Sequence, residues 1–230
     1  GILDVLQIFG RAGRPQYEDM GVSYICTSGE KLPHYIESIT SAHPIESTFL
    51  RGIVDALNAE VALGSVTSLD DGISWLGFTY LFTRLCKAPR VYGLDAHDFE
   101  ADPTLTQRRR QWITYAANIL TQHQMVEFDL AAGTLRPTNM GRIASRYYLS
   151  HKTVGIFHER LRNNLVEADA LSLMSRAADF DQIPLRESEE EELTSLLESV
   201  PCEVDGGTAT APGKVNILLQ AHISYLYVDD

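Results

Sequence analysis

A short two-stranded ribbon between helical segments is the feature that most constrains this fold. Residues 125–129, Met-Val-Glu-Phe-Asp, alternate apolar and polar side chains, which is the pattern of a half-buried strand. A turn that contains Gly133 follows, and residues 134–137 return as a second strand. Helices followed by such a ribbon are typical of a winged helix. We therefore expect a mostly α-helical chain with a small amount of β structure.

Helical patterns surround the ribbon. Residues 48–63 carry apolar side chains at helical spacing, and Ser68 offers an N-cap for a second helix, which we expect to end at Pro89. A further helix opens at Asp102-Pro103, and another covers residues 138–148. The wide apolar face of the second helix predicts that its aromatic side chains belong to the core rather than to a base-stacking surface; they are Trp75, Phe78, Tyr80 and Phe82.

The last third of the chain also reads as helical. Residues 187–192 form an acidic run, and leucines at helical spacing follow it. We expect a helix that carries these acids in its first turn, where the helix dipole favours them. Residues 205–213 are rich in Gly, Thr, Ala and Pro and predict a loop, and residues 215–228 predict a final helix.

The first 45 residues differ from the rest. They predict a short helix over 2–9, a β-rich strand over 21–27 and a helix over 30–39. This order is typical of the end of an α/β layer. Pro44 disfavours helical backbone at the residue before it, so we expect a domain boundary near this point.

Two arginines lie three positions apart in residues 7–14, Gln-Ile-Phe-Gly-Arg-Ala-Gly-Arg, and each follows a glycine. Glycine permits positive φ and close approach of the backbone to a ligand. The arginine fork matches phosphate oxygens, and such a pair suits the charge that develops on a γ-phosphate. The same residues would also serve as a basic surface turn, and their chemistry alone does not separate the two.

At this point the sequence resembles a known family. Gln-x-x-Gly-Arg-Ala-Gly-Arg-Pro, residues 7–15, looks like motif VI of superfamily 2 DExH-box helicases, and the Gln-Tyr that follows resembles the large branch with tandem helicase cassettes. Further blocks resemble that family's winged-helix domain in the same order; they are residues 57–60, 75–77, 92–94 and 141–145. Residues 180–187 are most similar to the signal-cointegrator and ribosome-quality-control type, and the chain is also similar to the spliceosomal snRNA-unwinding type.

The resemblance implies three parts. Residues 1–45 would end the second RecA-like ATPase lobe, residues 46–150 would form the winged-helix domain, and residues 151–230 would begin a Sec-type helical bundle. The implied activity of the full-length protein is ATP-dependent unwinding of RNA, with the winged helix and bundle bracing the motor and guiding one strand.

The resemblance also implies roles at the ATP site. Arg14 is expected to be the arginine finger, Arg11 to contact phosphate or bridge to the other lobe, and Gln7 and Gly10 to line the nucleotide cleft. The chain carries no phosphate loop and no acidic magnesium motif. ATP and Mg²⁺ would therefore be bound mainly by other parts of the protein, and this chain alone should be inactive.

The net charge of −12 is unevenly distributed. Residues 167–205 hold twelve acidic and two basic side chains (net −10), whereas residues 136–162 hold six basic and one acidic (net +5). The basic stretch could face phosphates, or it could form salt bridges within the protein. The candidate nucleic-acid contacts, with the nearby arginine triplet at 108–110, are Arg108, Arg109, Arg136, Arg142, Arg146 and Lys152.

Other functional classes find little support. The seven histidines lack metal-ligand spacing and the three cysteines form no CxxC pair, so we expect no metal site. No apolar run approaches the ~20 residues of a membrane span. Isolated thiols are typical of a reducing compartment, and we expect a cytoplasmic or nuclear protein. The expected partners are RNA or DNA, the missing RecA-like lobes, and subunits of a ribonucleoprotein or ribosome-associated complex. The alternative is a non-catalytic module of winged helix and helical bundle that binds proteins.

Overall fold

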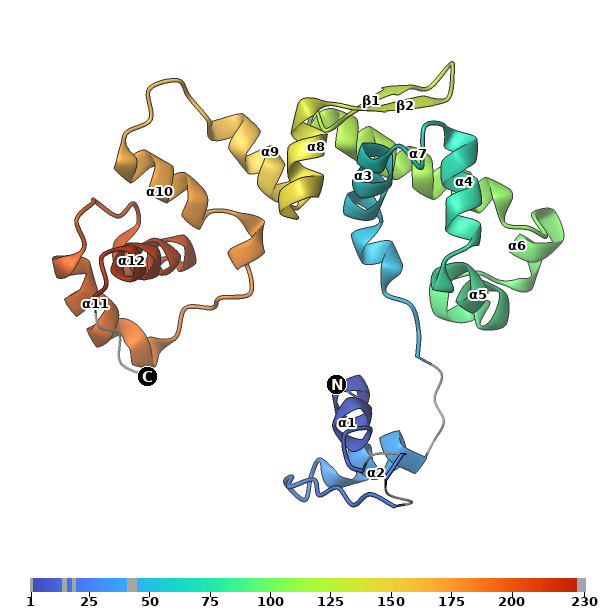
Figure 1. Ribbon diagram of the computed structural model, residues 1–230, viewed down its shortest axis with the longest axis horizontal. Helices are drawn as coiled ribbons and strands as arrows, with labels where there is room; N and C mark the ends of the chain where they lie inside the picture. The colour runs from blue at the N-terminus through green and yellow to red at the C-terminus, as the bar shows by residue number, and fades with distance from the viewer. Residues whose placement is uncertain (1, 14–15, 18–19, 41–44, 227–230) are drawn as a thin grey trace. The chain divides into compact units, whose positions relative to one another are not determined.

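The computed structural model describes residues 2–13, 16–17, 20–40 and 45–226 (Figure 1). The chain divides into two compact units, Gly1–Glu46 and Ser47–Asp230. Most described residues are helical, and the described residues contain one sheet, of two strands. The expected fold class, mostly α with a small β component, is confirmed.

The first unit contains the helices α1 (Ile2–Phe9) and α2 (Leu32–Thr40), which contact each other. The strand predicted over residues 21–27 is wrong, because this segment has no regular backbone hydrogen bonding. Its side chains are mostly exposed, with 86% of Tyr24 accessible. A strand needs a neighbour to satisfy its backbone groups. The described residues of this unit supply no second strand, so β propensity alone does not form one here.

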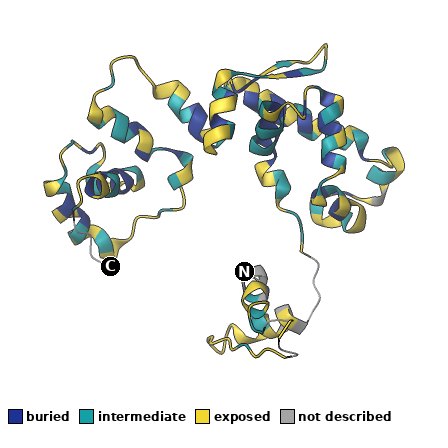
Figure 2. Cartoon of the chain, in the orientation of Figure 1, coloured by how far each residue is buried: buried dark blue, intermediate teal, exposed yellow. Residues whose placement is uncertain are grey.

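The second unit begins with a helical core. A 3₁₀ turn, η1 (Phe49–Gly52), leads into α3 (Ile53–Leu63), and α3 and α4 (Leu69–Gly77) both pack against α7 (Thr106–Gln122). Figure 2 shows the buried residues gathered where these helices meet; they include Leu57, Leu76, Ile113 and Leu120. The elements between α4 and α7 are α5 (Tyr80–Lys87), η2 (Pro89–Tyr92) and α6 (Ala96–Ala101).

The predicted ribbon is confirmed. Strands β1 (Val126–Asp129) and β2 (Thr134–Pro137) pair antiparallel, with Val126 opposite Pro137. The outer edge of β2 bonds to the segment before α4, because Leu135 N donates to Thr67 O and Leu69 N donates to Gly133 O, each at 2.8 Å. The hairpin is therefore attached to the helical core along its edge by hydrogen bonds, and it also contacts α3 and α7, as a wing does in a winged helix.

Two helix predictions need correction. The helix expected from Ser68 to Pro89 is two helices, because the Thr79 hydroxyl caps α5 by accepting from Phe82 N at 3.4 Å. The break leaves Phe78 91% exposed, contrary to its predicted place in the core. The helix expected at Asp102-Pro103 starts at Thr106, because the Asp102 carboxylate accepts the first free amides of α7 from outside the helix.

The ribbon leads into α8 (Asn139–Tyr147), as predicted, and then into α9 (His151–Arg160). The remaining helices surround a second core, in which α12 (Ala211–Ile223) contacts α10 (Glu167–Ser175) and α11 (Glu190–Ser199). Short 3₁₀ turns connect them: η3 (Ala178–Phe180), η4 (Glu187–Glu189) and η5 (Gly207–Ala209). The acids of residues 187–192 occupy η4 and the first turn of α11, as expected from the helix dipole.

Candidate functional site

The glycine–arginine turn directly follows α1. Arg11 N donates to Ile8 O and Ala12 N to Phe9 O, each at 3.0 Å, so the chain tightens into a turn as the helix ends. Gly13 follows with φ of 84°, a left-handed conformation that glycine adopts at little cost. Arg14 comes next in the sequence and lies outside the described residues.

A second glycine fixes the shape of this turn. A Cβ atom at Gly21 would lie 2.2 Å from Ala12 O, so only glycine lets the two backbone segments approach this closely. In the first unit Gln7, Gly10 and Arg11 are all exposed. Because Gly10 and Gly13 have no side chains, an anion could approach the backbone on either side of Arg11, as an anion-binding turn requires.

The arginine triplet of α7 divides into different roles. Arg109 is held inside the unit: its Nη1 donates to Ile73 O at 2.6 Å, its Nη2 to Thr104 O at 3.1 Å, and its guanidinium lies 4.8 Å from the Phe82 ring centre. Its donors brace α4 and the start of α7, which argues against the predicted phosphate contact. Arg108 lies 3.6 Å from the Asp98 carboxylate, and its side chain remains about a third exposed.

The other candidate cations follow the ribbon. Arg136 is exposed on β2, Arg142 and Arg146 are exposed on α8, and Lys152 is exposed in the first turn of α9. Within the described part of the chain, the salt bridges identified involve none of these four side chains. They are therefore available to an outside ligand, in contrast to Arg109.

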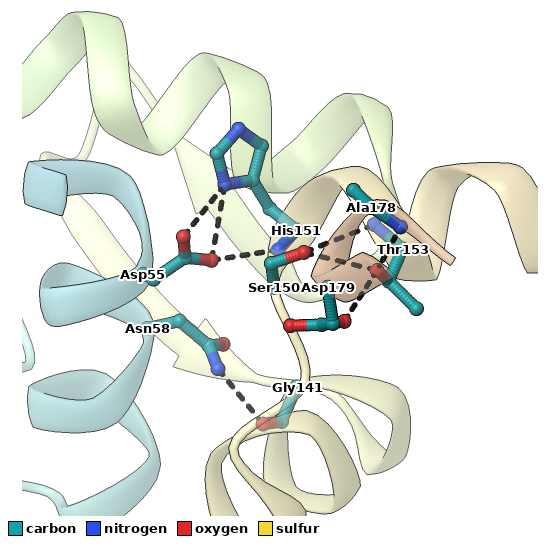
Figure 3. A network of polar contacts seen from close by, with 8 residues as sticks. All are labelled: Asp55, Asn58, Gly141, Ser150, His151, Thr153, Ala178 and Asp179. Carbon is teal, nitrogen blue, oxygen red and sulfur yellow. Dashed lines mark hydrogen bonds and ion pairs between the residues drawn. The ribbon is translucent and has the colours of Figure 1, made fainter. Parts of the chain in front are cut away.

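A polar network joins α8 and α9 to the rest of the unit (Figure 3). The Asp55 carboxylate accepts from the His151 backbone N at 2.6 Å, and one of its oxygens lies 3.0 Å from His151 Nδ1. Two residues further along α9, the Thr153 hydroxyl donates to Asp179 at 2.7 Å and accepts from Ala178 N at 3.0 Å. α9 is thereby anchored to α3 on one side and to η3 on the other. Nothing in the sequence pattern singled out this network, because its partners are far apart in the chain.

His123 packs beside this network at the end of α7. Its ring centre lies 6.0 Å from that of His151, and a Cβ at Gly155 would lie 2.5 Å from its Cε1 atom. Burial, with a smaller effect from nearby His151, lowers the pKa of His123 below its ordinary value. Among the described residues no group of three or more candidate ligands could hold a metal ion. None of the helices in the described part combines the length and hydrophobicity that a membrane span needs.

Two family models match successive parts of the chain. A model described as a winged helix-turn-helix domain matches residues 46–121, and the Sec63 Brl domain matches residues 137–230. The chain is 43% identical over 231 residues to activating signal cointegrator 1 complex subunit 3 of Bos taurus, covering 100% of this chain and 10% of the relative. It is 45% identical over 232 residues to the RQC trigger complex helicase of Saccharomyces cerevisiae, covering 100% and 12%.

A plant relative extends the comparison. The chain is 40% identical over 230 residues to a DExH-box ATP-dependent RNA helicase of Arabidopsis thaliana, covering 100% of this chain and 11% of the relative. The chain thus spans about a tenth of the length of the curated relatives it matches. Since similarity at this level runs through the whole chain, and the winged-helix and Sec63 Brl models follow one another along it, the chain belongs to the family of large DExH-box helicases.

Proposed function

We propose that the complete protein is an ATP-dependent RNA helicase, and that this chain supplies one wall of its ATP site together with the domains that brace the motor and guide a strand. The observation that carries the proposal is the similarity of the entire chain to helicases, with the glycine–arginine turn intact at the end of α1. A module that only binds proteins has no use for that turn.

The proposed roles at the nucleotide follow from the chemistry of each group. Arg14 is the arginine finger on the γ-phosphate, and Arg11 contacts phosphate or bridges to the facing lobe. Gln7 and Gly10 line the cleft. ATP and Mg²⁺ are bound mainly by parts of the protein other than this chain, and the chain alone does not hydrolyse ATP.

The proposed division of the chain keeps three parts. Residues 1–45 end the second RecA-like lobe, residues 46–150 form the winged-helix domain, and residues 151–230 begin the Sec-type bundle. The contacts of Asp55 with His151 and of Thr153 with Asp179 support a bracing role, because they tie α9 to both neighbouring parts of the second unit.

For nucleic acid, we keep the remaining candidate cations as proposed contacts and leave out Arg109, whose donors bind within the protein. RNA is favoured over DNA because a relative's name specifies RNA. A relative that belongs to the RQC trigger complex supports partners in a ribonucleoprotein or ribosome-associated assembly, in the cytoplasm or nucleus. The proposed contacts are Arg108, Arg136, Arg142, Arg146 and Lys152.

The arginine-finger role can be tested in the complete protein with Arg14→Ala. Losing an arginine finger should lower ATP turnover by about 10³-fold or more while leaving nucleotide affinity within a few-fold of wild type. Arg51→Ala, which removes an exposed arginine of the second unit, is the matched control and should retain turnover. Turnover of Arg14→Ala equal to wild type would refute the role.

The phosphate contacts can be tested separately by charge reversal. Arg142→Glu with Arg146→Glu should weaken RNA binding and reduce the slope of log K against log salt by roughly 0.7 for each lost contact to a single strand. A slope equal to that of wild type would mean that these arginines brace the protein instead.

A further inference from the structure

The outer surface of α8 carries two parallel rows of side chains. Arg142 and Arg146 form one row at i, i+4 spacing, and Ile143 and Tyr147 form the next row at the same spacing. All four are exposed, although the opposite side of α8 packs against α3 through Gly141 and Ala144. Tyr148 directly follows the last residue of the helix and is 92% exposed. We call these five residues the α8 face.

The stretch of sequence that forms α8 and its flanking segments carries charge of a single sign. From Leu130 to His158 the sequence contains Arg136, Arg142, Arg146 and Lys152 but no Asp or Glu, in a chain whose net charge is −12. A solvated helix in such an acidic protein would be expected to mix both signs. The α8 face itself carries two arginines and no carboxylate, which makes it complementary to a polyanion.

The two tyrosines add a second kind of recognition. Tyr147 is 65% exposed, and the Arg146 guanidinium lies 6.0 Å from its ring centre, so a flat ring and a cation lie together at the surface. Tyr148 holds a φ of 58°, a left-handed conformation that Asn or Gly adopts more easily than Tyr. Exposed rings beside arginines are what proteins use to stack the bases of a single strand while contacting its phosphates.

We propose that the α8 face binds single-stranded RNA, with bases stacked on Tyr147 and Tyr148 and phosphates contacted by Arg142 and Arg146. The proposal rests on the function proposed above and extends it from phosphate contact to base stacking. The two rows lie next to each other on α8, so one strand can contact both kinds of side chain. Its phosphates would follow the arginine row while its bases lie over Tyr147 and Tyr148.

Tyr225 offers a matched control within the same unit. It is 95% exposed and has a φ of 55°, so it shares both the exposure and the backbone conformation of Tyr148. It differs in its surroundings, because the charged residues that follow it in the sequence are Asp229 and Asp230. Both tyrosines are thus exposed and have left-handed backbone. Of the two, only Tyr148 lies in a stretch of sequence whose charged residues are arginine and lysine.

The test uses the complete protein with Tyr148→Asn, Tyr147→Leu and Tyr225→Asn, and measures affinity for a short oligouridine and for an abasic strand of the same length. Asn suits left-handed backbone, so Tyr148→Asn should be as stable as wild type or more so. It should nevertheless bind oligouridine about fivefold or more weakly, as expected from the loss of one stacked base. Tyr147→Leu should weaken binding similarly, and Tyr225→Asn should not.

The abasic strand separates this proposal from the one it extends. Tyrosine variants should leave its affinity unchanged, whereas Arg142→Glu should lower affinity for both strands. If the arginine variant weakens binding and both tyrosine variants do not, base stacking is refuted while the phosphate contacts stand. If the tyrosine variants lower ATP turnover but not RNA affinity, the α8 face docks another part of the protein, which also overturns the proposal.

Discussion

Gly141 is the position where one added methyl group should cost most. It lies in the first turn of α8, and a Cβ there would meet Met125 O at 2.0 Å and Asn58 Oδ1 at 2.8 Å. Real Cβ atoms essentially never come within 3.0 Å of another heavy atom, so α8 and the start of the ribbon would have to separate by about 1 Å (3.0 − 2.0). That displacement would also break the buried hydrogen bond from Asn58 Nδ2 to Gly141 O, which measures 3.0 Å.

The expected cost of Gly141→Ala follows from these contacts. Overpacking contributes about 1–3 kcal/mol, and leaving the buried Asn58 amide unpaired contributes about 1–3 kcal/mol. The better helix propensity of alanine offsets about 1 kcal/mol. A net loss of about 3 kcal/mol should lower the Tm by roughly 6–12 °C for a unit of this size.

The assay is thermal unfolding, with urea unfolding to check the free energy. Gly52→Ala is the control, because no atom lies within 4 Å of its added Cβ and its φ of −110° suits any residue. It should change stability by less than about 1 kcal/mol. A Tm for Gly141→Ala within about 2 °C of wild type would refute the close-contact argument.

Two further predictions concern His123 and Asp102. The folded-state pKa of His123 lies below its ordinary 6.5, so the unfolded chain binds the proton first and stability should fall as pH drops below about 6.5. His123→Gln should reduce that fall, which urea unfolding on either side of this pH would measure; an equal fall in both proteins would contradict it. The Asp102 carboxylate accepts from Thr106 N at 2.9 Å and Gln107 N at 2.7 Å, so Asp102→Ala should cost about 1–2 kcal/mol and Asp102→Asn much less. Equal stability of all three proteins would show that α7 needs no cap.

Elements whose signals are local were predicted correctly from the sequence. The helix over residues 2–9, the ribbon and α8 all follow from side-chain period and turn residues within a few positions of one another. Ser68 was correctly identified as an N-cap, since the cap and the amide of Asp71 lie three residues apart. The family, too, could be recognised from short motifs in a fixed order, because a motif is itself a local pattern.

Elements that depend on distant partners were not predictable in this way. Residues 21–27 have the composition of a strand but no partner strand among the described residues, and Arg109 resembles its neighbours in the sequence while its guanidinium bonds to Ile73 O. Phe78 fits an apolar helical face, yet the Thr79 cap turns it out to solvent.

The sequence by itself therefore determined which family this chain belongs to. It also determined which segments are helical or extended, wherever residues close together in the chain set the local conformation. It also carried the glycine–arginine turn, whose proposed chemistry rests on residue type and spacing. Tertiary structure alone decided which cations remain available, which aromatic rings face solvent, and how α9 is anchored through Asp55 and Asp179. The physical reason is that burial and hydrogen bonding between distant residues depend on packing, which no local pattern records.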